Sequence, residues 1–195
     1  MLRAFSVTQG TARGEIHGAR SSGATVERVM VGQPFRILFL SQRNTARGVM
    51  AEALANAIGG GEFEAFSAGV RPGARVDPVA AELLEHAGLT VPAHLPQHVR
   101  EFSAPDSPPL DFVFTLSDTA AGEAPPTWPG HPITAHWHCD DPAQFDDPAE
   151  KRQALIRTRA ELERRLRVFA NLPVKSLDRM SLQTYVEALG RSHHD

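Results

Sequence analysis

Cysteine is almost absent from this sequence, with a single residue of that type among 195. One cysteine cannot form an internal disulfide, so the fold does not rely on the cross-links that stabilise small secreted domains. Long apolar runs are also missing, since none approaches the about 20 residues that a membrane-spanning helix needs. No stretch has the apolar core and cleavage site of a secretory signal. These absences predict a cytoplasmic protein without a membrane partner.

A basic surplus is missing as well, because 20 Lys and Arg residues are outnumbered by 23 Asp and Glu residues and the formal net charge is −3. A protein that binds nucleic acid regardless of sequence needs excess positive charge to neutralise phosphates. Nucleic acid is therefore not an expected partner. The residues that are present, 42% hydrophobic and 22% charged, are typical of one globular domain of this length.

The first 33 residues differ in composition from the rest of the chain. They are rich in Gly, Ser, Thr and Arg and show no sustained apolar period. We interpret residues 1–33 as a flexible N-terminal extension, with an Arg-rich, transit-like leader as the alternative. The domain is expected over residues 34–195.

Apolar runs and helical periods alternate along that domain. Short apolar or alternating runs predict strands over 36–40, 63–67, 111–116 and 133–138. Periodic apolar residues predict helices over 49–58, 77–88, 147–169 and 182–189. Asp77-Pro78 and Asp147-Pro148 are typical of a helix N-cap followed by proline at the first helical position. The alternation predicts an α/β fold in which helices flank a four-stranded parallel sheet on both faces.

The segment after the first strand is the principal candidate for a ligand site. Ligands of open parallel sheets bind beyond the carboxyl ends of the strands, and a turn there can direct backbone N–H groups and a helix N-terminus at one anion. Arg47, six residues after Ser41, can add two parallel hydrogen bonds to a tetrahedral oxyanion. The predicted oxyanion-binding residues are Gln42, Arg43, Asn44, Thr45, Ala46 and Arg47.

Several further motifs accompany this loop, and together they give it specificity. They are Ser67-Ala68-Gly69, Val76-Asp77-Pro78, Trp128-Pro129-Gly130, Ala135-His136-Trp137 and Asp141-Pro142-Ala143. With the segment from Phe39 to Leu54, they make the chain resemble the low-molecular-weight protein tyrosine phosphatase superfamily, most closely its thioredoxin-coupled arsenate reductase branch. The resemblance runs from about Phe35 to near the C-terminus. It implies a phosphate-binding loop after the first strand.

The resemblance also implies catalytic positions, and the chain departs from the family at the most important of them. Ser41 stands where the family has the nucleophilic cysteine, whose pKa the helix N-terminus and the arginine lower. Arg47 keeps the arginine position, and Asp141 stands at the general-acid position of the phosphatase branch. Gly48 replaces the usual serine that steadies the thiolate.

The two further cysteines of the reductase branch are also missing. Their positions correspond to Ser117 and Pro125, so the disulfide relay that arsenate reduction requires cannot form. These departures predict a degenerate, pseudoenzyme-like member that binds phosphate, arsenate, sulfate or a phosphorylated group without efficient turnover. We expect no cofactor, and a protein partner is one way for such a chain to act.

Two alternatives stay open. In the first, the chain is a weakly active phosphatase in which Asp141 assists water or Ser41 attacks slowly. In the second, a metal binds around His136, His138 and Cys139, with the neighbouring aspartates as further candidate ligands. Cys139 as a displaced nucleophile is disfavoured, because two adjacent aspartates are expected to raise its pKa. The arginines of the 147–169 helix are interpreted as a solvated surface with intrahelical ion pairs.

Overall fold

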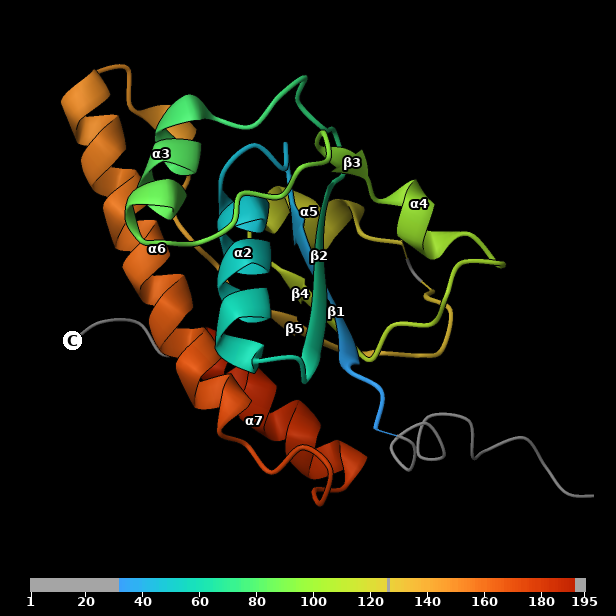
Figure 1. Ribbon diagram of the computed structural model, residues 1–195. Coiled ribbons are helices and arrows are strands. Elements are labelled where there is room, and N and C mark those ends of the chain that lie inside the picture. The colour runs from blue at the N-terminus through green and yellow to red at the C-terminus, as the bar shows by residue number, and fades with distance from the viewer. Residues whose placement is uncertain (1–31, 126, 192–195) are drawn as a thin grey trace, which may run out of the picture.

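Five parallel strands form one sheet in the computed structural model, which describes residues 32–125 and 127–191 (Figure 1). The strand order is β3-β2-β1-β4-β5. The strands are β1 Phe35–Ser41, β2 Phe63–Gly69, β3 Gln97–His98, β4 Phe112–Thr115 and β5 Ile133–His136. Because the central strand β1 carries the candidate loop at its carboxyl end, that loop lies at the middle of the edge where ligands of such sheets bind.

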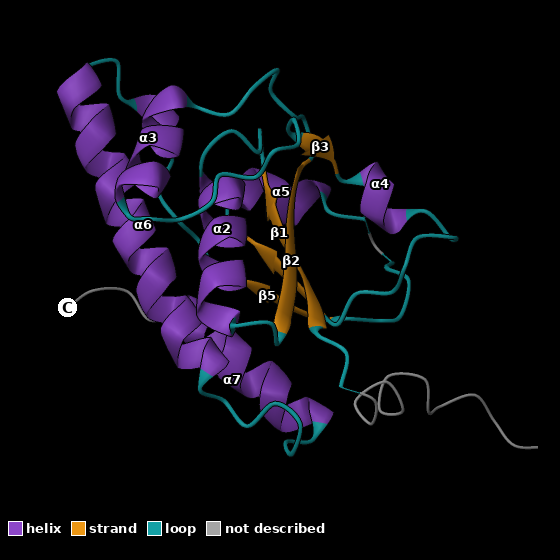
Figure 2. Cartoon of the chain, in the orientation of Figure 1, coloured by secondary structure: helices purple, strands orange, loops and turns teal. Residues whose placement is uncertain are grey.

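Helices connect the strands and cover the sheet. Their bounds are α2 Arg47–Gly59, α3 Pro78–His86, α4 Arg100–Ser103, α5 Asp118–Glu123, the 3-10 turn η2 Pro142–Gln144, α6 Pro148–Ala170 and α7 Arg179–Arg191. Figure 2 shows α2, α3 and α6 gathered on one side of the strands. None of the helices in the described part of the chain combines the length and apolar character that a bilayer crossing demands.

Side chains of β1 alternate between two cores, as the period of two in a strand requires. Ile37 and Phe39 belong to the larger core, which also contains the inner residues of α2, α6 and α7. Leu38 and Leu40 point to the other face and join a smaller cluster with Ala120 of α5. Burial on both faces explains the continuous apolar run in this strand.

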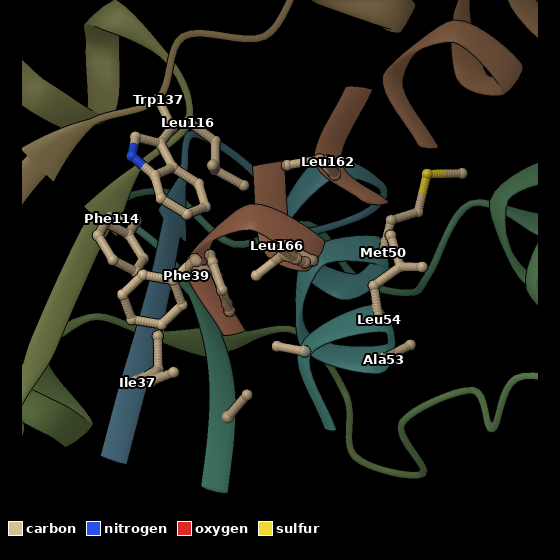
Figure 3. Close-up of a cluster of buried hydrophobic side chains, with 14 of the residues drawn as sticks. Ile37, Phe39, Met50, Ala53, Leu54, Phe114, Leu116, Trp137, Leu162 and Leu166 are labelled. Atoms are coloured by element: carbon tan, nitrogen blue, oxygen red, sulfur yellow. The ribbon is translucent and has the colours of Figure 1, made fainter. Parts of the chain in front are cut away.

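An aromatic group at the centre of the larger core holds the segment that follows β5 (Figure 3). The Trp137 ring stacks on Phe114 with centroids 4.0 Å apart and planes 12° apart, and its edge packs against Phe169 of α6. Trp137 Nε1 donates to the carbonyl of Val186 in α7 at 2.9 Å. This buried indole therefore anchors residues 137–141 at the same edge of the sheet as the candidate loop.

The predicted α/β parallel sheet is confirmed, with corrections to its elements. The sheet has five strands instead of four, because the two-residue strand β3 adds to the edge beside β2. The strand expected over 133–138 ends at His136, and the last helix begins at Arg179 instead of residue 182. Helices α4 and α5 were not predicted, since four and six residues are too few to show a period. The extension predicted over 1–33 lies outside the described residues except for its last two positions.

Candidate functional site

Residues 41–47 connect β1 to α2, and backbone hydrogen bonds to the segment after β2 hold this loop. Its carbonyl oxygens point outward and accept hydrogen bonds from the amides of that segment. Val70 N donates to Ser41 O at 3.1 Å, Arg71 N to Gln42 O at 2.9 Å, Gly73 N to Arg43 O at 2.8 Å, and Asp77 N to Thr45 O at 2.8 Å. Gly69 permits this close approach, because a Cβ there would lie 3.0 Å from Gln42 O.

The outward carbonyls determine where the loop amides point. In a planar trans peptide, the C=O of one residue and the N–H of the next point in opposite directions, and the described residues contain no cis peptide. The amides of residues 42, 43, 44 and 46 therefore turn toward the inside of the loop. The carbonyl of Ala46 accepts from Met50 N within α2, so the Arg47 amide faces the same concavity. A cluster of amides at a helix N-terminus favours an anion.

Asn44 occupies the sharpest point of the loop. Its φ of 51° is in the left-handed region, which Asn tolerates better than most residues. The Asn44 amide donates to Ser41 Oγ at 3.1 Å. Its side chain is buried, and neither Oδ1 nor Nδ2 has a hydrogen-bond partner in the described residues. Oδ1 occupies the space beside Gly48, where a Cβ would lie only 2.2 Å away.

Arg47 closes the concavity from the opposite side. Its guanidinium is buried; Nη1 donates to the carbonyl of Cys139 at 2.9 Å, and Nη2 lies 3.4 Å from Asp141 Oδ1. Asp141 also caps η2, because Oδ1 accepts from Ala143 N at 3.1 Å. Loop, guanidinium and carboxylate border a cavity of about 30 Å³. The predicted residues Ser41, Arg47 and Asp141 are thus brought together at one small cavity.

Lys151 is a member of this site that sequence reasoning missed. It lies in the first turn of α6 and borders the cavity. Its Nζ is 2.5 Å from Asp77 Oδ2, while Asp77 Oδ1 caps α3 through Val79 N. The cavity therefore has a second cation opposite the loop. Arg43, by contrast, is exposed at the rim.

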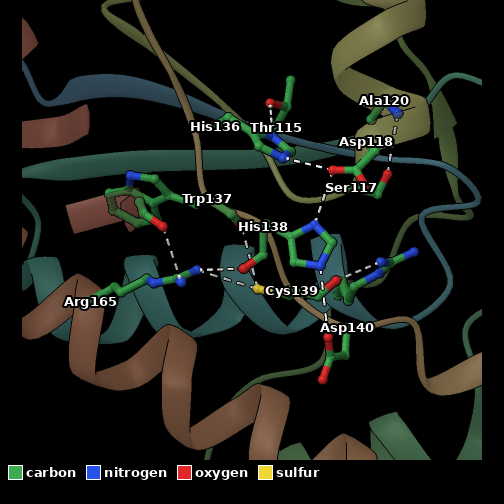
Figure 4. Close-up of polar contacts among 12 residues, drawn as sticks. Thr115, Ser117, Asp118, Ala120, His136, Trp137, His138, Cys139, Asp140 and Arg165 are labelled. Carbon is green, nitrogen blue, oxygen red and sulfur yellow. Dashed lines mark hydrogen bonds and ion pairs between the residues drawn. The ribbon is translucent and has the colours of Figure 1, made fainter. Parts of the chain in front are cut away.

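The metal ligands predicted around residues 136–139 are only partly brought together. His136 and His138 do converge, but on Asp118 of α5 and not on Cys139 (Figure 4). Cys139 points the other way, where it is buried and lies 3.7 Å from Arg165 Nη1. It is therefore not available as a ligand to the histidine pair.

The raised pKa expected for Cys139 is confirmed, but its cause differs. Burial, followed by the charge of Glu161, raises the pKa of this thiol to about 12; the adjacent aspartates are not the cause. The expectation that the arginines of the 147–169 helix lie on a solvated surface is wrong for Arg165, which is fully buried. It donates to His138 O at 2.9 Å and lies 2.5 Å from Glu161 Oε1.

Ser117, at a position where the resemblance places a redox cysteine, has a structural role in this chain. It is buried, and its Oγ accepts from Ala120 N at 3.2 Å as the N-cap of α5. Pro125 lies two residues beyond the end of that helix. The region thus retains a short capped helix but has no sulfur.

A parallel sheet with an inward-facing amide loop after its central strand defines a phosphatase-like α/β protein, and comparison with known proteins identifies the family. The chain belongs to the low molecular weight phosphotyrosine protein phosphatase family, whose model matches residues 36–183. Arsenate reductase of Bacillus subtilis is 33% identical over 138 residues, which cover 69% of this chain and 94% of that protein. These matches place the chain near the arsenate reductase branch.

Solved structures agree with this assignment. An arsenate reductase from Archaeoglobus fulgidus is 31% identical with a TM-score of 0.55, and the match covers 70% of this chain and 99% of that one. A cysteine-to-serine mutant of the arginine phosphatase YwlE, with a phosphorylated active-site serine, shares the fold at 24% identity. Its TM-score is 0.57, and the match covers 75% of this chain and 99% of that one.

Proposed function

We propose that the loop of residues 41–47 binds a tetrahedral oxyanion, namely phosphate, arsenate, sulfate or a phosphorylated group, without efficient turnover. The observation that carries this proposal is the set of loop amides turned inward by the outward carbonyl bonds. Arg47 and Lys151 border the same cavity, where they pair with Asp141 and Asp77 and can turn their positive charge to an anion. Preorganised donors of this kind bind an anion with little reorganisation. The chain would act in the cytoplasm as a sensor, a sequestering module or a docking partner of a phosphorylated protein.

Inefficient turnover follows from the surroundings of Ser41. A serine hydroxyl needs an adjacent general base to become a useful nucleophile. In the described part of the chain, the contact of Ser41 Oγ is the Asn44 amide, which donates to it and cannot remove its proton. The nearby carboxylate of Asp141 is engaged by Arg47 and by the η2 cap.

An oxyanion that binds to Arg47 must compete with the carboxylate of Asp141. At 3.4 Å the Arg47–Asp141 ion pair is longer than a charge-assisted hydrogen bond of about 2.8 Å, so Nη2 is engaged only weakly and its N–H groups can bond to an incoming oxyanion. Nη1 stays fixed on Cys139 O at 2.9 Å. One arm of the guanidinium is therefore a permanent anchor, and the other is available to the ligand.

Calorimetric titration with phosphate, arsenate and sulfate tests the proposal, with the Arg47→Ala variant beside the unchanged chain. Loss of a charge-assisted hydrogen bond of about 1.5–3 kcal/mol predicts at least a tenfold weaker affinity. Arg43→Ala is the matched control, because that exposed arginine sits at the rim and its loss should change the affinity only a few-fold. Equal affinity in Arg47→Ala, or no binding to the unchanged chain, would contradict the proposal.

A second candidate function is slow phosphoryl transfer to Ser41. The phosphorylated serine of the YwlE mutant is the observation that favours it. In this chain, Ser41 would keep the phosphoryl group, because the carboxylate at the cavity, Asp141, is engaged by Arg47 and by the η2 cap. Intact-mass measurement after incubation with an aryl phosphate would detect one added phosphoryl group that Ser41→Ala abolishes.

Phosphatase assays separate both candidates from an active hydrolase. Binding without turnover predicts no activity in the unchanged chain and measurable activity only in Ser41→Cys, in which Asp141 can protonate the leaving group. Repeated turnover by the unchanged chain, reduced by Asp141→Asn, would instead establish an active hydrolase.

A further inference from the structure

We propose that His136, His138 and Asp118 form a binding site for one divalent transition-metal ion of the Zn²⁺ class. The site lies beside the oxyanion loop at the carboxyl edge of the sheet, and it uses none of the loop residues (Figure 4). It goes beyond the proposed anion binding, because either site can exist without the other.

The topology of the sheet brings these three residues together. Strands β4 and β5 are parallel neighbours, with Thr115 paired to His136 at their ends. Asp118 opens the helix that follows β4, and His138 comes two residues after His136, with both imidazoles in contact with Asp118 Oδ1. Three ligands from two adjacent connections thus meet at one edge, although Asp118 and His138 are 20 residues apart.

The distances suit a metal ion. Asp118 Oδ1 lies 3.0 Å from His136 Nε2 and 3.1 Å from His138 Nδ1, and the three donor atoms lie within 4.8 Å of one another. Zinc bonds of about 2.0–2.2 Å in a tetrahedral arrangement place ligand atoms about 3.3–3.6 Å apart. An opening of a few tenths of an ångström in each Asp118–histidine distance therefore matches zinc geometry, and the donor atoms of the two histidines lie no more than 4.8 Å apart. Two imidazoles and one carboxylate leave the fourth position to water or a substrate.

The contacts of the two ring nitrogens that face away from Asp118 are a second argument for a metal site. A metal-bound imidazole commonly donates its other N–H to a hydroxyl, carbonyl or carboxylate, which fixes its tautomer. His136 Nδ1 lies 2.8 Å from Thr115 Oγ1, and His138 Nε2 lies 3.7 Å from Asp140 Oδ1. His136 thus has a hydrogen-bond partner on the nitrogen that points away from Asp118, whereas His138 has only a longer contact with a carboxylate there. The donors are partly exposed, which gives an ion a route to them.

Zinc titration by calorimetry on the metal-depleted full chain tests this site. We expect one equivalent bound, and at least a tenfold lower affinity in both Asp118→Ala and His138→Ala, since loss of even an outer contact costs about tenfold. The Co²⁺ complex should show tetrahedral absorption without a sulfur-to-cobalt charge-transfer band, because buried Cys139 takes no part. Circular dichroism on each variant checks that a weaker affinity does not reflect unfolding.

Three controls decide between this site and other histidines. His86→Ala removes an exposed histidine outside the cluster, and His193→Ala with His194→Ala removes the pair near the C-terminus of the sequence; both should bind zinc as the unchanged chain does. Lys151→Ala should also keep its zinc affinity, because Lys151 borders the oxyanion cavity but pairs with Asp77 and not with residues 136–139; this separates the two sites. Unchanged affinity in Asp118→Ala and His138→Ala, or loss of binding with the C-terminal pair, would overturn the proposal.

Discussion

The loop 41–47 and the segment 136–141 lie at the same edge of the sheet but are held in different ways. Backbone amides after β2 hold the loop through its carbonyl oxygens. The segment has two backbone hydrogen bonds, from Trp137 N to Thr115 O and from Cys139 N to Leu116 O. Side chains hold it as well: Arg47 donates to Cys139 O, Arg165 to His138 O, and buried Trp137 to α7. A loop shaped by its backbone is largely indifferent to the side chains it carries, whereas a segment held partly by side chains depends on them.

This difference bears on the proposed function, a site kept without its nucleophile. A serine in place of the family's cysteine at position 41 would remove the chemistry and leave the carbonyl bonds that shape the loop. The loop amides and Arg47 are the groups that would then bind the anion. Binding and reaction thus rest on separate parts of the same seven residues.

The largest expected effect is a difference in alkylation rate between two thiols, one in the segment 136–141 and one introduced into the loop. Burial and the charge of Glu161 raise the pKa of Cys139 to about 12, so this thiol stays protonated at neutral pH. A cysteine introduced by Ser41→Cys sits at a helix N-terminus beside Arg47, where thiol pKa values fall below the usual range. Iodoacetate should alkylate the Ser41→Cys variant at least 100-fold faster than the unchanged chain, as measured by mass spectrometry.

Phosphate gives this labelling experiment its control. An oxyanion in the loop should protect the introduced thiol from iodoacetate and leave the slow reaction of Cys139 unchanged. Equal labelling of the two thiols would show that the loop does not stabilise an anion.

The second effect concerns a charge buried under the segment. Arg165 is fully buried, pairs with Glu161 and donates to His138 O. Arg165→Met leaves that carboxylate and that carbonyl without their partner, which should lower the free energy of unfolding by about 3 kcal/mol or more. Arg167→Met is the matched control on the same helix, because its exposed i,i+4 pair with Glu163 contributes about 0.5 kcal/mol. Urea denaturation measures both, and similar losses would contradict the side-chain anchoring of the segment.

Local signals in the sequence predicted the loop and the helix starts, whereas contacts between distant elements could not be predicted. Asp77 and Asp147 cap α3 and α6 as expected, because a cap acts within three residues of its own position. Lys151 reaches Asp77 only because two helices begin side by side. The burial of Arg165 was likewise missed, since its neighbours along α6 are mostly charged. Asp118 meets the histidines because β4 and β5 are neighbours in the sheet, and this strand order could not be predicted from the sequence.

The third effect concerns the contact between Asn44 of the loop and Gly48 of α2. Alanine is intrinsically favoured over glycine in a helix by up to about 1 kcal/mol. A Cβ at Gly48, however, would lie 2.2 Å from Asn44 Oδ1, whereas a Cβ at Gly122 of α5 meets no atom within 4 Å. Gly48→Ala should therefore destabilise the chain by about 1–2 kcal/mol, and Gly122→Ala should leave it unchanged or slightly more stable. Thermal unfolding compares the two, and a stable Gly48→Ala variant would mean that Asn44 moves freely.

The smallest effect concerns two serines that make the same local bond. Ser41 Oγ accepts from Asn44 N at 3.1 Å, and Ser117 Oγ accepts from Ala120 N at 3.2 Å. Ser117→Ala removes the cap of α5 and should cost about 1 kcal/mol. Ser41→Ala should cost no more than that, because four carbonyl bonds hold the loop without it.

The phosphate affinity of Ser41→Ala is a second test of what shapes the loop. If the backbone shapes the loop, Ser41→Ala keeps the affinity for phosphate within a few-fold of the unchanged chain, as calorimetry would show. The opposite result would be a Ser41→Ala variant that loses its phosphate affinity and more than about 2 kcal/mol of stability, which is more than one ordinary hydrogen bond supplies. The hydroxyl of Ser41 would then be a structural replacement for the sulfur, and the loop would depend on its side chains as the segment 136–141 does.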